Sequence, residues 1–129
     1  MLAEAGRGEE AIALLARTRE LLAPSHWKAE FANVVWKAVR LGRLQIDRMD
    51  DLISTAGQLP ITTIDVGELW RGAIARAVAA DHPVYDTLFV ELAVRERTVV
   101  ASYDSGLQRR FPRLVRTPRR LLRRAPLSR

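Results

Sequence analysis

The stretch Val84–Leu107, VYDTLFVELAVRERTVVASYDSGL, predicts a nearly apolar helix followed by a short β-branched strand. Asp86 lies near the start of this helix, and Asp104 directly follows the strand. On a helical wheel, Asp86 shares its face with Val90 and Ala93. A carboxylate on an apolar face is costly unless a cationic group lies beside it. We therefore expect a cation, such as a metal ion, near Asp86.

Helices and short buried strands alternate along the rest of the chain, which indicates an α/β domain with a short parallel sheet flanked by helices. Such a domain normally begins with a strand, whereas this sequence begins directly with a helix. The segment 20–24 fits either a buried strand or a continuation of the first helix. The expected helices are 9–19, 26–41, 46–57, 66–80, 84–96 and 105–111, and the expected strands are 61–64, 98–101 and 114–115, with 20–24 as a strand in the first of these two alternatives.

The composition excludes several classes of protein. The chain has 129 residues, enough for one domain with a hydrophobic core, and 48% of them are hydrophobic. The absence of cysteine excludes disulfides, zinc–thiolate sites and thiol nucleophiles. No apolar run approaches the roughly 18 residues of a membrane span, and the N-terminal sequence is not a signal peptide. We expect a cytoplasmic protein that does not bind membranes.

The positive charge is concentrated at the C-terminal end. Residues 109–129 contain nine arginines and no acid, whereas residues 1–108 carry a net charge of −3. This asymmetry indicates a polyanionic partner such as RNA. A bias towards arginine in the coding sequence is the competing explanation, because 19 of the 21 basic residues are arginine.

Three acids lie where acids are poorly tolerated: Glu30, Asp86 and Asp104. Glu30 falls at the edge of the apolar arc of its helix, and it can instead turn to solvent or pair with a neighbouring base. Asp86 and Asp104 can each cap a helix. When Asp104 is considered by itself, capping is the favoured role. Glu91 points about 140° away from Asp86 on the wheel, so we expect it to face solvent.

Taken together, the three acids predict a site for a hard cation. Mg²⁺ and Mn²⁺ prefer oxygen ligands, usually a few carboxylates with water and substrate phosphate. Such ions activate water and neutralise the charge that develops on a phosphodiester. Each acid belongs to a different element, so the three side chains can converge at the C-terminal edge of the sheet.

The segments LLAPSHWKAEFANVVWKAVRLGRL (21–44) and HPVYDTLFVELAVRERTVVASYDSGL (82–107) resemble the PIN-domain ribonucleases, specifically the VapC-type toxins of toxin–antitoxin pairs. The family has a glutamate on the helix after Pro-Ser, with an asparagine three residues on, which matches Glu30 and Asn33. The pattern Y-D-x-x-x-x-x-L-A matches Asp86. A strand ending in T-x-D matches Asp104, with Ser102 in place of threonine.

The resemblance implies a PIN-like three-layer domain over residues 1–117, followed by an Arg-rich tail over 118–129. PIN domains begin with a central strand that carries the first metal-binding aspartate, and no such segment precedes the first helix here. We therefore expect an N-terminally incomplete domain in which the central first strand is missing. Either translation starts further upstream, or the domain is naturally truncated.

The implied function is a metal-dependent endoribonuclease that hydrolyses RNA phosphodiesters with Mg²⁺ or Mn²⁺. Glu30, Asp86 and Asp104 would be the metal ligands, and Asn33 and Ser102 would orient ligands or water. The implied partners are RNA, an antitoxin protein and a second copy of the chain in a homodimer. Two alternatives are an inactive truncated PIN-like module that binds an antitoxin or RNA, and a helical interaction domain without a metal site. His26 and His82 adjoin helix ends, where we expect capping or surface roles.

Overall fold

The computed structural model describes residue 10, residues 13–18 and residues 20–123. Of the helix expected over 9–19, residues 10 and 13–17 are helical, and 9, 11, 12 and 19 lie outside the described residues. The other expected elements are present with small shifts at their ends. In chain order they are β1 (Leu21–Pro24), α2 (Trp27–Arg40), α3 (Ile46–Gly57), β2 (Ile61–Ile64), α4 (Val66–Ala80), α5 (Val84–Arg95), β3 (Val100–Ala101), α6 (Ser105–Arg110) and β4 (Val115–Arg116). A further helix, α7 (Pro118–Arg123), lies in the Arg-rich tail, where no helix was expected.

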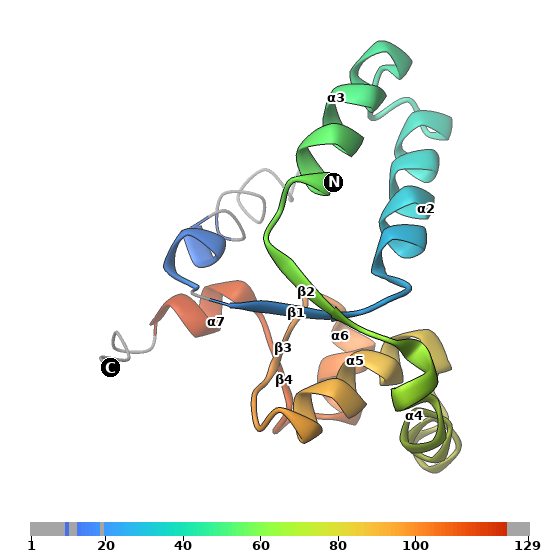
Figure 1. Cartoon of the computed structure of the whole chain (residues 1–129), viewed down its shortest axis with the longest axis vertical. Helices are drawn as coiled ribbons and strands as arrows, with labels where there is room; N and C mark the ends of the chain where they lie inside the picture. Colours follow the sequence, from blue (N-terminus) through green and yellow to red (C-terminus); the bar gives the residue numbers. More distant parts are fainter. Residues whose placement is uncertain (1–9, 11–12, 19, 124–129) are drawn as a thin grey trace.

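The strands form two separate two-stranded sheets, β1–β2 and β3–β4, and both are parallel. Each pair is joined by a helical crossover, through α2 and α3 in the first sheet and through α6 in the second. The expectation of an α/β domain with short parallel strands flanked by helices is therefore confirmed (Figure 1). The expected loss of a central first strand and the boundary at residue 117 stay predictions.

Helix α5 contributes to both hydrophobic cores. On one side, Leu88 and Leu92 pack with Leu69 and Ala73 of α4, against residues of β1 and β2. On another side, Val90 packs with buried residues of α6 and β4. This double burial explains why the helix is almost wholly apolar in sequence, since few of its positions face water.

Helices α4 and α5 lie in close contact. The buried Thr87 hydroxyl donates to the carbonyl oxygen of Ala73 at 2.8 Å. A Cβ atom added at Gly72 would lie 2.3–2.5 Å from the carboxylate atoms of Glu91, so only glycine leaves room for that group. The sequence thus uses a helix-destabilising glycine to let a side chain of α5 reach the backbone of α4.

The expectation that Glu91 faces solvent is wrong, because its residue is only 8% exposed. Its two carboxylate oxygens accept from Arg76 Nε at 2.8 Å and from Arg95 Nε at 2.9 Å. Burial acts to raise the pKa of Glu91, but the hydrogen bonds and positive charges of the two arginines outweigh it and hold that pKa below 4.5. The side chain of Glu91, on α5, therefore faces α4 and not water.

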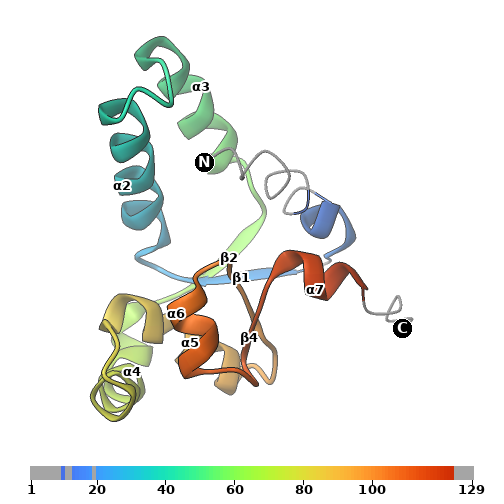
Figure 2. The ribbon, with the colours of Figure 1, turned by 180° about the vertical axis from the view of Figure 1, so that it is seen from behind.

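Helices α2 and α3 form a hairpin that projects away from the two sheets (Figure 1). Gly42, in the turn between them, has a φ of 71°, a left-handed conformation that favours glycine. Because the hairpin projects, several of its large apolar side chains are exposed, among them Val34 at 57% and Trp36 at 53%. Seen from behind, the molecule has α6 and α7 at the front (Figure 2). None of the helices formed by the described residues has the length and apolar character needed to cross a membrane.

Replacing Gly72 with alanine should lower the free energy of unfolding by about 1–3 kcal/mol, because the new methyl group expels the Glu91 carboxylate from its two arginines. Gly57→Ala is the matched control, since nothing lies within 4 Å of its added Cβ. That control should be neutral or stabilising by up to about 1 kcal/mol, the helix propensity gained. Urea denaturation measures both. Equal stability of the two variants would contradict the close α4–α5 contact.

Replacing Glu91 with glutamine should destabilise the protein in a pH-dependent way. A carboxyl whose pKa is lower in the folded state stabilises the fold above its unfolded pKa, near 4.5, and loses that effect as the pH falls through the folded value. We expect the free energy of unfolding to fall by about 1–3 kcal/mol at neutral pH. This range allows for solvent screening of Arg95, which is half-exposed. Denaturation at several pH values should show the difference from wild type shrinking below 4.5. A pH-independent difference would refute the ion-pair explanation.

Candidate functional site

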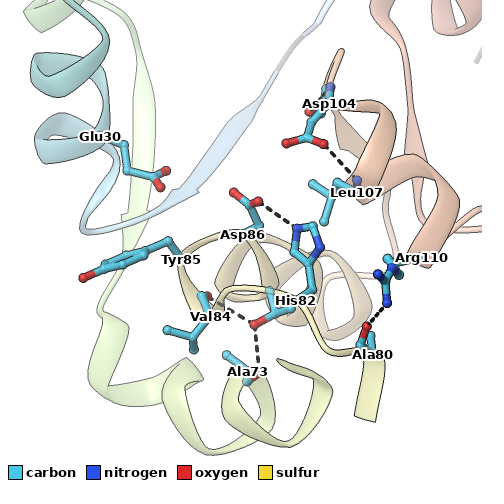
Figure 3. A network of polar contacts seen from close by, with 12 residues as sticks. Glu30, Ala73, Ala80, His82, Val84, Tyr85, Asp86, Asp104, Leu107 and Arg110 are labelled. Carbon is cyan, nitrogen blue, oxygen red and sulfur yellow. Dashed lines mark hydrogen bonds and ion pairs between the residues drawn. The ribbon is translucent and has the colours of Figure 1, made fainter. Parts of the chain in front are cut away.

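The three predicted acids come from the beginnings of three different helices. Glu30 lies in the first turn of α2, Asp86 lies in the first turn of α5, and Asp104 immediately precedes α6. Figure 3 shows the Glu30 and Asp86 carboxylates directed towards the same space, with Asp104 above Asp86 in this view, at the start of α6. Acids in first helical turns are stabilised by the positive end of the helix dipole, which helps to hold negative charge here.

Glu30 and Asp86 are close enough to affect each other electrostatically. Burial raises the pKa of the Glu30 carboxyl above 4.5, the charge of His26 opposes this effect, and the negative charge of Asp86 adds to it. The Glu30 side chain is 37% exposed and that of Asp86 is 33% exposed. Two partly desolvated carboxylates that repel each other provide a place where a cation would bind favourably.

Asp86 is held by His82, which precedes it by four residues and lies just before α5. His82 Nε2 lies 2.9 Å from Asp86 Oδ2, and the imidazole is only 11% exposed. Since an ionised carboxylate only accepts hydrogen bonds, Nε2 must carry the proton. The bond occupies one oxygen of Asp86 and leaves Oδ1 for another partner.

His26 links the helix that carries Glu30 to the helix that carries Asp86. Its Nε2 lies 3.1 Å from the carbonyl oxygen of Tyr85 and 3.5 Å from Glu30 Oε1. The ring also packs against Phe89, with the ring centroids 5.3 Å apart. Because these contacts join the start of α2 to α5, they bring Glu30 to the same side of the molecule as Asp86.

Asp104 caps α6, as expected for that residue taken alone. Its Oδ1 accepts from the backbone N–H of Leu107 at 2.9 Å. Ser102 Oγ accepts from the N–H of Asp104 at 3.0 Å, which fixes the backbone at the start of the cap. Asn33 is exposed on α2. Of the two residues predicted to orient ligands, Ser102 contacts a predicted ligand through the backbone of Asp104.

The donor set has the chemistry that Mg²⁺ requires, although it does not form a closed cage. Across the part of the chain that the structure describes, no group of three or more His, Cys, Asp and Glu side chains is arranged to hold a metal ion. Mg²⁺ usually takes one or two carboxylates and completes its coordination with water and substrate phosphate. The mutually repelling pair of Glu30 and Asp86 fits this requirement, and the assignment of Glu30, Asp86 and Asp104 as ligands stays a prediction.

Sequence reasoning missed both histidines. We expected capping or surface roles for His26 and His82, but each contacts a predicted site acid and each is largely buried. A signal was present in the sequence: each histidine precedes an acid by four residues, as in His26–Glu30 and His82–Asp86. Residues at this spacing lie on neighbouring turns of a helix and can form side-chain pairs.

The chain is similar to a ribonuclease of known type. It is 32% identical over 100 residues to the protein named Ribonuclease VapC3 from Mycobacterium tuberculosis strain CDC 1551 / Oshkosh, and equally to that of strain ATCC 25618 / H37Rv. The aligned region covers 78% of this chain and 71% of the relative. No protein-family model matches the chain.

Glu30→Gln should make the metal-free protein more stable at neutral pH. A carboxyl with a raised pKa in the folded state destabilises the fold once the pH rises from its unfolded value, near 4.5, through the folded value. The gain should stay below about 1 kcal/mol, because Glu30 is more than one-third exposed and solvent screens its charge. It should vanish in melting curves taken well below 4.5. Glu68→Gln, an exposed first-turn acid of α4, should show no gain. A variant no more stable than wild type would contradict the crowding of Glu30 and Asp86.

Proposed function

The chain belongs to the VapC-type ribonucleases of the PIN-domain family, and on this premise we propose that it is an endoribonuclease that hydrolyses RNA phosphodiesters at a site that holds Mg²⁺ or Mn²⁺. The observation that supports this best is the approach of Glu30 and Asp86. They come from distant parts of the sequence, and the charge of Asp86 contributes to the raised pKa of Glu30. Like charges brought together at a partly buried site suit a divalent cation.

Each acid has its own part in the proposed reaction. Glu30 and Asp86 would hold the cation, with Asp104 as a third oxygen donor. The bound ion would lower the pKa of a water molecule and stabilise negative charge on the phosphate. Ser102 would hold Asp104 through its contact with the Asp104 backbone. Asn33, which is exposed on α2, would meet water or substrate.

The partners follow from the same proposal. The substrate would be RNA, and arginines at the C-terminal end of the chain, such as Arg109 and Arg113, are exposed and could contact its phosphates. A small antitoxin protein would block the site, and a second copy of the chain would form a homodimer. Exposed apolar side chains offer surfaces for both, including Trp36 on α2 and Trp70, Ile74 and Val78 on α4. We propose that the protein works in the cytoplasm, consistent with its lack of cysteine.

Purified protein should cleave RNA when Mg²⁺ or Mn²⁺ is present and should stop when the metal is chelated. Asp86→Asn and Asp104→Asn should each lower the cleavage rate by more than about 100-fold, because even outer partners of a metal site are worth about 10–100-fold. The substrate is a randomised RNA oligonucleotide, resolved by gel after a time course. Asp47→Asn, an exposed first-turn acid of α3, is the matched control and should cleave like wild type.

The outcomes separate the candidate functions. Cleavage that persists in both Asp86→Asn and Asp104→Asn would refute the proposed site. A protein that binds RNA or an antitoxin without cutting RNA in either metal would instead favour the inactive binding module. That second function is supported by the absence of a three-ligand group among the described residues.

A further inference from the structure

We propose that His82 is a positioning residue, which orients the Asp86 carboxylate for the cation through a hydrogen bond from Nε2 to Oδ2. The inference rests on the proposed function, since it concerns the same site, and it assigns a role to a residue for which the sequence predicted none. Three observations support it: the fixed backbone of His82, the geometry of the hydrogen bond, and the position of the ring next to the start of α6, which Asp104 caps.

The backbone of His82 is fixed on both sides. Asp81 ends α4 in a left-handed conformation with φ of 53°, and the N–H of His82 donates to the carbonyl oxygen of Ala77 at 3.1 Å. Pro83 follows and restricts the conformation of the residue before it. The turn therefore sets the direction of the Cα–Cβ bond of His82, and the hydrogen bond to Asp86 directs the imidazole before any ligand binds.

The hydrogen bond leaves Asp86 suited to bind a cation. At 2.9 Å it has good length, and the 11% exposure of the imidazole protects it from competing water. Because Oδ2 is occupied, the carboxylate cannot rotate freely, and Oδ1 stays directed away from the histidine (Figure 3). Carboxylates that bind metals commonly accept such a bond from a neighbouring group, which fixes their orientation.

The imidazole also lies beside the residues that hold Asp104. A Cβ atom added at Gly106 would lie 3.2 Å from Asp104 Oδ1 and 3.9 Å from His82 Cε1, so both groups border the same residue at the start of α6. In Figure 3 the ring lies next to Asp86, with Leu107 and Asp104 above it at the start of α6. His82 therefore holds Asp86 and at the same time lies next to the start of α6.

A purely structural pair would link the α4–α5 turn to the first turn of α5 without any effect on cation binding. Two substitutions distinguish these roles. His82→Leu removes the donor, whereas His82→Gln places an amide N–H near the position of Nε2 and keeps it. Loss of the donor should change cation affinity under the positioning role, whereas both variants should change only stability under the structural role.

The first experiment measures Mn²⁺ binding to the full chain by the electron paramagnetic resonance signal of free Mn²⁺. His82→Leu should bind Mn²⁺ about 10-fold more weakly than wild type, the usual effect of losing an outer partner, and His82→Gln should retain most of the affinity. Wild-type affinity in His82→Leu, or equal losses in both variants, would overturn the inference alone. A wild-type chain that binds no Mn²⁺ would overturn the proposed function together with this inference.

The second experiment needs neither metal nor a folded leucine variant. Long-range ¹H–¹⁵N spectra of the wild-type chain, in mildly alkaline buffer where histidine is ordinarily neutral, report which ring nitrogen carries the proton. The signals of His82 are those that disappear in His82→Gln. We expect the Nε2–H tautomer. The Nδ1–H tautomer, or a mixture of the two, would overturn the inference because Asp86 could not then be held by Nε2.

Discussion

The burial of α5 on two sides is the constraint on which the rest of the structure depends. Its residues complete one core with α4, β1 and β2 and a second core with α6 and β4. Thr87 and Glu91 make the polar contacts that fix α5 against α4, and Gly72 provides the space that Glu91 needs. Since both sheets rest on one helix, the position of α5 sets where the starts of the other helices lie relative to Asp86.

The candidate site follows from this arrangement. Asp86 lies in the first turn of α5, where chain direction and burial leave it at the boundary between core and solvent. His26 attaches the start of α2 to the backbone of Tyr85, and Glu30 is thereby brought towards Asp86. His82 holds Asp86 from the other side, next to the start of α6. Three helices begin in this region, each with an acid near its positive end, and the two histidines contact two of these acids.

Much of this could be predicted from the sequence, because periodicity and breakers are local signals. The apolar face that contains Val90 and Ala93 is buried, and Ile61–Ile64 is a strand, as predicted. The errors concern tertiary context. Glu91 was assigned to solvent by the helical wheel, which contains no information about a second buried side of α5. Likewise, the four-residue spacing indicates that His26 and His82 can pair with Glu30 and Asp86, but it does not specify their positions beside Tyr85 and Gly106, which depend on tertiary packing.

The central claim is that Glu30, Asp86 and Asp104 surround a single cation site. Paramagnetic broadening by Mn²⁺ in ¹H–¹⁵N spectra of the full chain tests it most directly. At low Mn²⁺ the backbone amides at the starts of α2, α5 and α6 should broaden together, while those near the exposed acids Asp47, Asp50 and Asp51 of α3 should keep their intensity. Broadening centred on α3, or on the surroundings of only one of the three predicted ligands, would contradict the account.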